Sequence, residues 1–202
     1  SSISISLSTR PSGSFTSRSI HVSFRFVDGK LITIAVYEED GFQYRPEAIR
    51  EKITSQTRAV FINSPSNPTG NLLSADRMQQ IAELTKCEQC PYIVSDEIYH
   101  GLVYEGKAHS ILEFSDHAFV LNGFSKQFAM TGLRLGYVIA PKTFIRPMQK
   151  MQQNFFISAG SISQWAGIAA LKKARDDVER MKAILVLLCL FISALLVFGI
   201  GA

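Results

Sequence analysis

Three short apolar runs, each followed at once by polar residues, constrain the fold of this 202-residue chain most strongly. They span residues 59–62, 92–95 and 118–121. Runs of this length and character are typical of strands buried inside a parallel sheet. Segments with helical spacing of apolar residues separate them, and strands that alternate with helices form βαβ units. The sequence therefore predicts an α/β fold with three layers, α-β-α, around a mostly parallel sheet.

Several further elements are expected from local signals. Pro46 stands at the first position of one predicted helix, and Ser74 is placed to cap the start of another that runs to Lys86. The remaining expected elements are strands over 31–36 and 137–140 and helices over 47–55, 110–114, 143–154 and 161–173. Three aromatic residues, Tyr44, Tyr104 and Trp165, are expected to serve packing.

The polar residues after the three runs carry the candidate chemistry. The first run leads into Asn-Pro-Thr-Gly (67–70) and the second into Asp-Glu-Ile-Tyr (96–99). The third leads into a turn with Lys126 and, eight residues on, Arg134. If the strands are parallel neighbours, these motifs converge on one edge of the sheet, where open α/β sheets bind ligands. A lysine and an arginine held over a strand end suggest a phosphorylated cofactor that carries an aldehyde.

These motifs, in this order, resemble the fold-type I pyridoxal-phosphate enzymes of the class I/II aminotransferase family. The amino-acid sequences of these motifs are most similar to those of aspartate-aminotransferase-like members. The similarity covers about residues 26–184, which implies a partial large, cofactor-binding domain over 26–182, truncated at both ends. Members of the family carry, upstream, a loop that cradles the cofactor phosphate and, downstream, a small domain with an arginine that grips the substrate carboxylate.

The resemblance assigns the catalytic role to Lys126. Its amine would hold the cofactor aldehyde as a Schiff base and, once displaced by substrate, would move the proton between Cα and C4′. Asp96 would pair with the pyridine nitrogen and keep it protonated, so that the ring serves as an electron sink.

The same resemblance implies four further cofactor contacts. Tyr99 and Asn67 would reach the phenolic oxygen of the ring from opposite sides. Arg134 would bind the phosphate with its planar, permanently charged guanidinium. Ser125 is a candidate for an additional hydroxyl donor, although some relatives carry that hydroxyl where this chain has Gly123.

The expected function is transfer of an amino group between an amino acid and a 2-oxo acid, with pyridoxal 5′-phosphate as cofactor. We expect this chain by itself to be catalytically impaired, because the stretch that resembles the family includes neither the upstream phosphate-binding loop nor the downstream arginine that grips the substrate carboxylate. A carbon–sulfur lyase or a cyclopropane-carboxylate synthase would keep the same cofactor residues, and a membrane-tethered remnant without activity is a third interpretation. A dinucleotide-binding domain is rejected, since no G-x-G-x-x-G follows any predicted strand. Family members are typically homodimers, located in the cytoplasm, plastid or mitochondrion.

The two ends of the chain differ from the rest. Residues 1–25 are rich in Ser and Arg and contain no acidic residue, which is typical of an organellar transit peptide or a disordered tail. Residues 183–202 carry no charge, and a helix of that length would be long enough for a single membrane span. A misjudged gene boundary is the alternative interpretation of that tail.

The charge and the cysteine spacing bear on whether the chain binds nucleic acid or a metal ion. The net charge of +4 is mild, and no basic stripe with interleaved aromatics indicates nucleic-acid binding. Cys87 and Cys90 have the C-x-x-C spacing of a redox motif or half of a zinc site. No second ligand pair is spaced for zinc, so no metal site is expected. The two cysteines are predicted to be free thiols in a reducing compartment.

Overall fold

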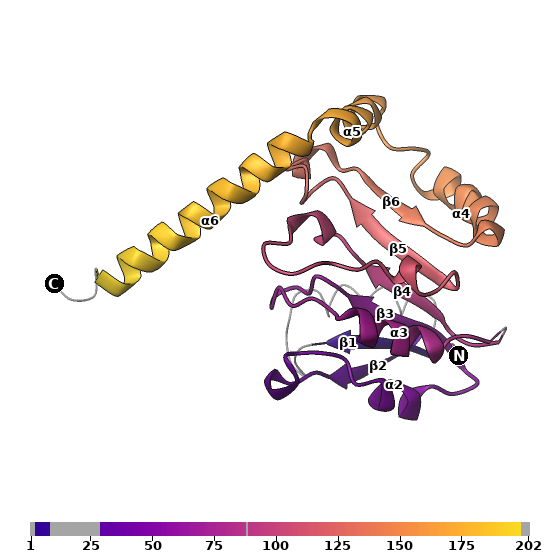
Figure 1. The fold of residues 1–202 in the computed structure, drawn as a ribbon. Coiled ribbons are helices and arrows are strands. Elements are labelled where there is room, and N and C mark those ends of the chain that lie inside the picture. The colour runs from indigo at the N-terminus through magenta and orange to yellow at the C-terminus, as the bar shows by residue number, and fades with distance from the viewer. Residues whose placement is uncertain (1–2, 9–28, 88, 199–202) are drawn as a thin grey trace.

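The computed structural model describes residues 3–8, 29–87 and 89–198 of the chain. The strands in this part are β1 Ile3–Ser8, β2 Lys30–Ala35, β3 Thr57–Asn63, β4 Tyr92–Asp96, β5 Ala118–Gly123 and β6 Gly136–Ile139. They form one sheet in the order β2-β1-β3-β4-β5-β6 (Figure 1). Neighbouring strands are parallel except β5 and β6, which pair antiparallel. The predicted α/β class and mostly parallel sheet are confirmed.

Helices and single turns connect the strands. The α-helices are α2 Pro46–Lys52, α3 Ala75–Glu83, α4 Lys142–Phe155, α5 Ser161–Lys173 and α6 Arg175–Phe198. The 3₁₀ turns are η1 Glu38–Asp40, η2 His100–Leu102, η3 Ile111–Glu113 and η4 Thr131–Leu133. Each predicted helix has a counterpart, and the start signals hold: Pro46 opens α2, and Ser74 Oγ accepts the N–H of Arg77 at 3.2 Å.

Two predicted helices end earlier than expected. The sequence predicts helix as far as Ser55 and as far as Lys86, but α2 ends at Lys52 and α3 ends at Glu83. For α3 the local contacts give the reason. The buried Thr85 hydroxyl donates to the carbonyl oxygen of Ala82 at 3.0 Å, and the N–H of Thr85 also donates to that oxygen. A threonine that bonds locally to the backbone competes with continued helix, which explains the early end.

The hydrophobic core lies between one face of the sheet and the helices α2 and α3. Val60, Ile93 and Val120 come from three neighbouring strands and are almost fully buried. They belong to one cluster with Ile49 of α2 and Met78 of α3, neither of which is exposed to solvent. Burying these side chains supplies the hydrophobic stabilisation that holds the three strands in register.

The opposite face of the sheet is contacted by α4. The ring of Phe144, in the first turn of α4, meets Tyr92 edge-on at 5.1 Å and Phe119 at 5.0 Å between centroids. Tyr92 and Phe119 alternate with the core residues Ile93 and Val120 along their strands, so they point to the other face. The predicted layers, helix on sheet on helix, are therefore present around β4 and β5.

The first strand was not predicted. Residues 3–8 form β1, which lies between β2 and β3 and pairs with both in parallel. The sequence analysis assigned this stretch to a segment of transit-peptide or disordered character over 1–25. Residues 9–25 of that segment lie outside the described residues, as do residues 1–2.

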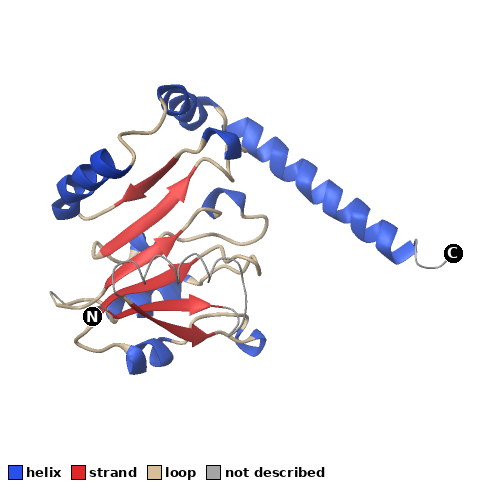
Figure 2. Ribbon diagram, turned by 180° about the vertical axis from the view of Figure 1, so that it is seen from behind, coloured by secondary structure: helices blue, strands red, loops and turns tan. Residues whose placement is uncertain are grey.

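The last helix, α6, extends away from the sheet in both views (Figures 1 and 2). Several of its apolar side chains are exposed to solvent, among them Leu187, Leu190 and Phe191, each more than 60% exposed. In the described part of the chain, no helix meets the length and apolar character required to cross a membrane. Residues 199–202 of the apolar tail lie outside the described residues.

Two of the three aromatic packing predictions were wrong. Tyr44 is buried, as expected, but Tyr104 is 51% exposed and Trp165 is 73% exposed. Tyr104 lies in the open loop between η2 and η3. Trp165 lies on the outward side of α5, whose buried residues are Gly167 and Ala170.

The cysteine prediction was also wrong. Cys87 and Cys90 are joined by a disulfide, with their Cα atoms 5.0 Å apart. The turn between α3 and β4 brings the two residues within the separation that a disulfide spans. Cys189, in α6, is a free and exposed thiol.

Candidate active site at the carboxyl edge of the sheet

The carboxyl ends of β3, β4 and β5 lie side by side. Asn63, the last residue of β3, pairs with Asp96, the last residue of β4, and Asp96 pairs with Leu121 of β5. Beyond the ladder, Asn63 Nδ2 donates to the carbonyl oxygen of Asp96 at 2.9 Å. The predicted parallel neighbourhood of the three strands is confirmed, and the three motifs leave from one edge.

The loop after β3 presents Asn67. The side-chain oxygen of Asn63 accepts the N–H of Asn67 at 2.8 Å, and the carbonyl of Ser66 accepts the N–H of Gly70 at 2.7 Å. Gly70 has φ of 73°, which glycine adopts without strain. The exposed Asn67 side chain reaches across to the next loop, where its Nδ2 donates to the hydroxyl oxygen of Tyr99 at 3.3 Å.

Lys126 lies over the ring of Tyr99. Its Nζ is 5.6 Å from the ring centroid, within reach of a cation–π attraction. The turn after β5 holds the lysine, because the N–H of Ala129 donates to the Lys126 carbonyl at 3.2 Å and the N–H of Phe128 to that of Phe124 at 3.3 Å. The side chain of Lys126 is exposed. The structure thus brings Asn67, Tyr99 and Lys126 together from three loops.

Asp96 stands beside this group at the end of β4. Its Oδ1 accepts the N–H of Ile98 at 3.1 Å. Burial raises the pKa of the Asp96 carboxyl, and the bond from Ile98 opposes that shift only in part. Within the part of the chain that the structure describes, no cation pairs with this carboxylate. A half-buried carboxylate of this kind would gain from a cationic ligand atom.

Ser125 and Arg134 are joined to each other through Thr131 rather than to the lysine. The Thr131 hydroxyl donates to the carbonyl oxygen of Ser125 at 3.0 Å, and Arg134 Nη1 donates to the carbonyl oxygen of Thr131 at 3.1 Å. Arg134 is exposed and has left-handed backbone, with φ of 51°. No hydrogen bond or ion pair in the described residues connects its guanidinium with Asn67, Tyr99 or Lys126. The sequence analysis missed Thr131, which holds the two turns together.

Glu97 is a second residue that the sequence analysis missed. Its side chain is almost completely buried, and its Oε1 accepts bonds from Ser95 Oγ, Ser110 Oγ and the N–H of Ile111 at 3.0–3.1 Å. Its Oε2 is 3.5 Å from Nδ1 of His100. Glu97 therefore fastens η2 and η3, which flank the loop behind Tyr99, to the end of β4.

A signal for Glu97 exists in the sequence. Ile93, Ser95 and Glu97 alternate along β4 and its end, and all three are buried. Period-two alternation places Glu97 on the core face of the strand, where a carboxylate needs donors. The neighbouring Asp96 faces the other way, so the two adjacent acids have different environments.

A cavity of about 570 Å³ opens beside the site. Asn67 and Tyr99 line it together with the loop residues Leu72, Leu102 and Tyr104. The volume is within the range of small-molecule sites. The phenol of Tyr99 and the amide of Asn67 line this cavity, and the Lys126 amine lies over the tyrosine ring. With the Asp96 carboxylate at the end of the adjoining strand, these groups can bind a polar ring that carries an electrophilic carbon.

Comparison with known proteins gives the site a family context. Residues 12–186 match the family described as Aminotransferase class I and II. A (5-formylfuran-3-yl)methyl phosphate transaminase of Methanocaldococcus jannaschii is 48% identical over 133 residues, which are 64% of this chain and 35% of that protein. An aspartate/prephenate aminotransferase of Thermus thermophilus is 39% identical over 148 residues, 73% of this chain and 38% of that protein.

Solved structures agree with the sequence relatives. A Thermus thermophilus aspartate aminotransferase variant in complex with tryptophan superposes with a TM-score of 0.84 at 35% identity, over 98% of this chain and 51% of that one. An aromatic aminotransferase of Pyrococcus horikoshii gives 0.81 at 32% identity, over 90% of this chain and 48% of that one. The chain spans about half of these structures and somewhat over a third of the two sequence relatives.

Proposed function

The chain belongs to the class I and II aminotransferase family, and on that premise we propose that it is a pyridoxal-phosphate-dependent transaminase. It would move an amino group between an amino acid and a 2-oxo acid. The observation that carries this proposal is the arrangement of Asn67, Tyr99 and Lys126 at the carboxyl edge of the sheet. Asn67 Nδ2 is 3.3 Å from the Tyr99 hydroxyl oxygen, and Lys126 Nζ is 5.6 Å from the centroid of the Tyr99 ring.

The residues present fit the cofactor. The exposed Lys126 amine would hold its aldehyde carbon, and Asp96, a half-buried carboxylate with no cation in the described residues, would pair with its ring nitrogen. Tyr99 and Asn67 would contact the phenolic oxygen, and Arg134 the phosphate, with Ser125 as an additional hydroxyl donor. When bound, the cofactor supplies an electron sink that allows the substrate Cα–H bond to break.

The chain's own residues would handle the proton. Once the substrate amine has displaced it, Lys126 Nζ would accept the proton from Cα of the substrate and return it one position away. The ring of Tyr99 lies beneath that ammonium group and stabilises its charged form by cation–π attraction. Asp96, as the anion, would keep the ring nitrogen protonated, because an opposite charge beside a carboxyl favours its ionised form and counters the effect of burial.

Substrates and assembly follow from the family. Amino acids and 2-oxo acids are the substrate classes, and we infer an aspartate or aromatic amino acid as donor from the names of the relatives. A homodimer is the assembly that we propose. Light scattering on the purified protein would test it, with a dimer mass expected and a monomer mass as the contrary result.

The proposal is tested by nitrogen transfer. The purified chain is mixed with pyridoxal phosphate, a ¹⁵N-labelled donor (aspartate, tyrosine or phenylalanine) and 2-oxoglutarate, and labelled glutamate is measured by mass spectrometry. We expect label transfer by the wild type and by Lys172→Ala, which removes an exposed lysine of α5. We expect none with Lys126→Ala.

Product analysis separates the alternatives. Release of ammonia and pyruvate from a sulfur-containing amino acid, without label transfer, would identify a lyase instead. Label transfer that survives in Lys126→Ala would contradict the role assigned to the lysine. Since we expect a low rate from this chain, the measurement is made with the protein concentration near that of the donor.

A further inference from the structure

The disulfide lies at the edge of the sheet opposite the candidate active site. Cys87 and Cys90 occupy the turn between α3 and β4, and β4 starts at Tyr92. The site residue Asp96 stands at the other end of that strand. The C-x-x-C motif therefore has no part in the proposed transamination, and its chemistry needs its own explanation.

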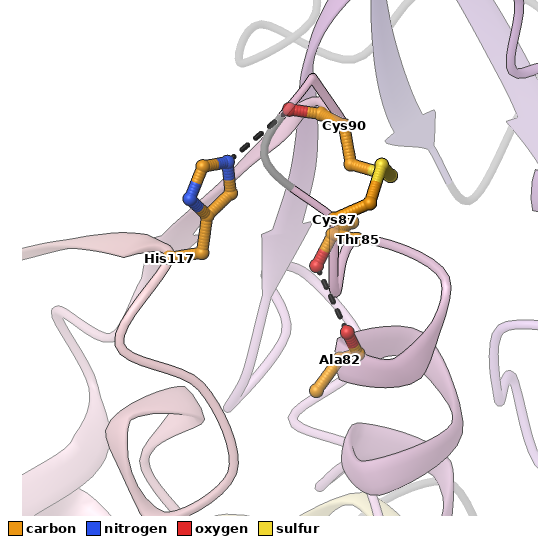
Figure 3. The surroundings of a disulfide bond; sticks show 5 residues. All are labelled: Ala82, Thr85, Cys87, Cys90 and His117. Carbon is orange, nitrogen blue, oxygen red and sulfur yellow. Dashed lines mark hydrogen bonds between the residues drawn. A yellow bond between two sulfur atoms is a disulfide. The ribbon is translucent and has the colours of Figure 1, made fainter.

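Contacts other than the S–S bond hold each cysteine in place (Figure 3). On one side, the buried Thr85, two residues before Cys87, is fixed to the end of α3 by its hydroxyl bond to Ala82 at 3.0 Å. On the other side, Nε2 of His117 donates to the carbonyl oxygen of Cys90 at 3.2 Å. The N–H of Cys90 also donates to the carbonyl oxygen of Cys87 at 3.0 Å.

His117 is itself held rigidly. Its ring stacks on Tyr92 with 3.7 Å between centroids, and its backbone N–H donates to the hydroxyl oxygen of Ser115 at 3.1 Å. The backbone turn is thus supported from the end of α3 and from the start of β5. The two cysteines would stay close after the S–S bond is broken, and they could join again.

The two sulfur-bearing residues differ in access. Cys87 is exposed, whereas Cys90 is partly covered. A cavity of about 380 Å³ opens next to Cys87, with Lys86 and His117 among its lining residues. An approaching thiolate therefore has room at Cys87. The lining holds charges of both signs, since Lys86 favours an anion there and Asp116 opposes it, so access to the sulfur rather than net charge supports the site.

We propose that Cys87 and Cys90 form a reversible redox site that exchanges electrons with a dithiol reductant. A thiolate of the reductant attacks Sγ of Cys87, a mixed disulfide forms, and the bond between the two cysteines breaks. Cys90 leaves as a thiolate and takes a proton from water. The second thiol of the reductant then attacks the mixed disulfide, which releases Cys87 as a thiol and the reductant as its own disulfide. Two electrons pass to the protein in each cycle.

The test is a redox titration of the folded wild-type chain. The protein is equilibrated in graded ratios of reduced to oxidised dithiothreitol and then alkylated with a maleimide. Tryptic peptides are weighed, because residues 87–107 and the free Cys189 fall in different peptides. We expect the peptide 87–107 to pass from no label to two labels with one midpoint, and to lose reactivity again in oxidised dithiothreitol. The Cys189 peptide should be labelled at every point.

Two controls and two contrary outcomes complete the test. Circular dichroism should be unchanged across the titration, and Cys87→Ser should leave Cys90 with one label at every ratio. Two labels at all ratios would show that no disulfide forms and would overturn the proposal. Labelling only after a denaturant is added would show a buried, inert staple and would also overturn it. Nitrogen transfer should be unaffected by Cys87→Ser, so this test and that of the transaminase fail independently.

Discussion

The side-chain amide of Asn67 donates a hydrogen bond of 3.3 Å to the hydroxyl of Tyr99, and this bond joins the loop after β3 to the loop after β4. The ring of the same tyrosine carries the Lys126 ammonium group on its face. Tyr99 thus makes two separable contacts, since its hydroxyl accepts the hydrogen bond from Asn67 and its ring attracts the Lys126 ammonium group. A substitution that removes the hydroxyl and keeps the ring tests the contribution of the hydrogen bond alone.

Tyr99→Phe removes the hydroxyl and keeps the ring. We expect the affinity for pyridoxal phosphate to fall about three- to tenfold, because one hydrogen bond contributes about 0.5–1.5 kcal/mol. Stability should change by less than about 0.5 kcal/mol, because the Asn67 amide is exposed and water replaces the lost partner. Spectroscopic titration measures the affinity, and Tyr104→Phe, at an exposed tyrosine of the same cavity, is the matched control.

Glu97→Ala leaves two buried donors, the Ser95 hydroxyl and the Ile111 N–H, and one half-buried donor, the Ser110 hydroxyl, without their acceptor. We expect a loss of roughly 3 kcal/mol in the free energy of unfolding, since each unsatisfied buried donor costs about 1–3 kcal/mol. Glu97→Gln keeps one oxygen and should lose less. Urea denaturation measures both, with Glu105→Ala on the exposed loop as control. An unchanged midpoint for Glu97→Ala would contradict the anchoring role.

Asp96→Asn should raise the free energy of unfolding of the cofactor-free chain while it weakens cofactor binding. Burial raises the pKa of this carboxyl in the folded state, so the folded chain binds the proton more readily than the unfolded chain does. The favourable contribution of the protonated form is present at low pH and is lost as pH rises through the raised pKa. The cofactor-free Asn variant should therefore be more stable than the wild type near neutral pH, and the difference should shrink on acidification. A constant difference in urea melts across that range would contradict the burial argument.

The same variant should lose cofactor affinity. An amide cannot supply the negative charge that keeps the ring nitrogen protonated. A variant that is more stable yet binds pyridoxal phosphate less tightly is the expected outcome, and equilibrium dialysis measures the binding. Equal affinity in the wild type and the Asn variant would exclude the pairing that we assign to Asp96.

Gly167 sets how closely α5 approaches the lysine-bearing turn. A Cβ at this position would lie 2.6 Å from Leu135 Cδ2 and 3.2 Å from Phe124 Cζ. Overpacking of this kind costs about 1–3 kcal/mol, and the helix preference of alanine returns about 1 kcal/mol. We expect Gly167→Ala to be destabilised by about 1 kcal/mol. Gly132→Ala, whose Cβ meets nothing within 4 Å, should be neutral. A more stable Gly167→Ala would refute the close approach.

The arrangement of the candidate site was largely readable from the sequence. The apolar runs that became β3, β4 and β5 are short and strongly apolar, which predicts strands buried in a parallel sheet. If these strands are neighbours, their carboxyl ends, and with them Asn67, Tyr99 and Lys126, fall on one edge, and the pairing of β3 with β4 and of β4 with β5 confirms that they are neighbours. The cofactor roles of all six site residues remain predictions, because the geometry brings side chains together but does not test their contacts with a cofactor. These residues are Asn67, Asp96, Tyr99, Ser125, Lys126 and Arg134.

Three features were not predicted from the sequence: the first strand, the disulfide and the link through Thr131. Residues 3–8 alternate Ile, Ser, Ile, Ser, Leu and Ser, a period-two strand signal that the Ser-rich composition outweighed. The disulfide needed the turn geometry after α3, where Thr85 ends the helix. The link through Thr131 depends on a 3₁₀ turn that no periodicity marks.

The most direct test of the account locates the cofactor on the chain. The protein is incubated with pyridoxal phosphate, reduced with borohydride to make the attachment permanent, and digested with trypsin. Attachment at Lys126 blocks cleavage there, so the account predicts a cofactor-bearing peptide of residues 108–134 in place of 108–126 and 127–134. The modified peptide should vanish in Lys126→Ala. Cofactor found on a different lysine, or on none, would contradict the assignment of Lys126 as the residue that holds pyridoxal phosphate.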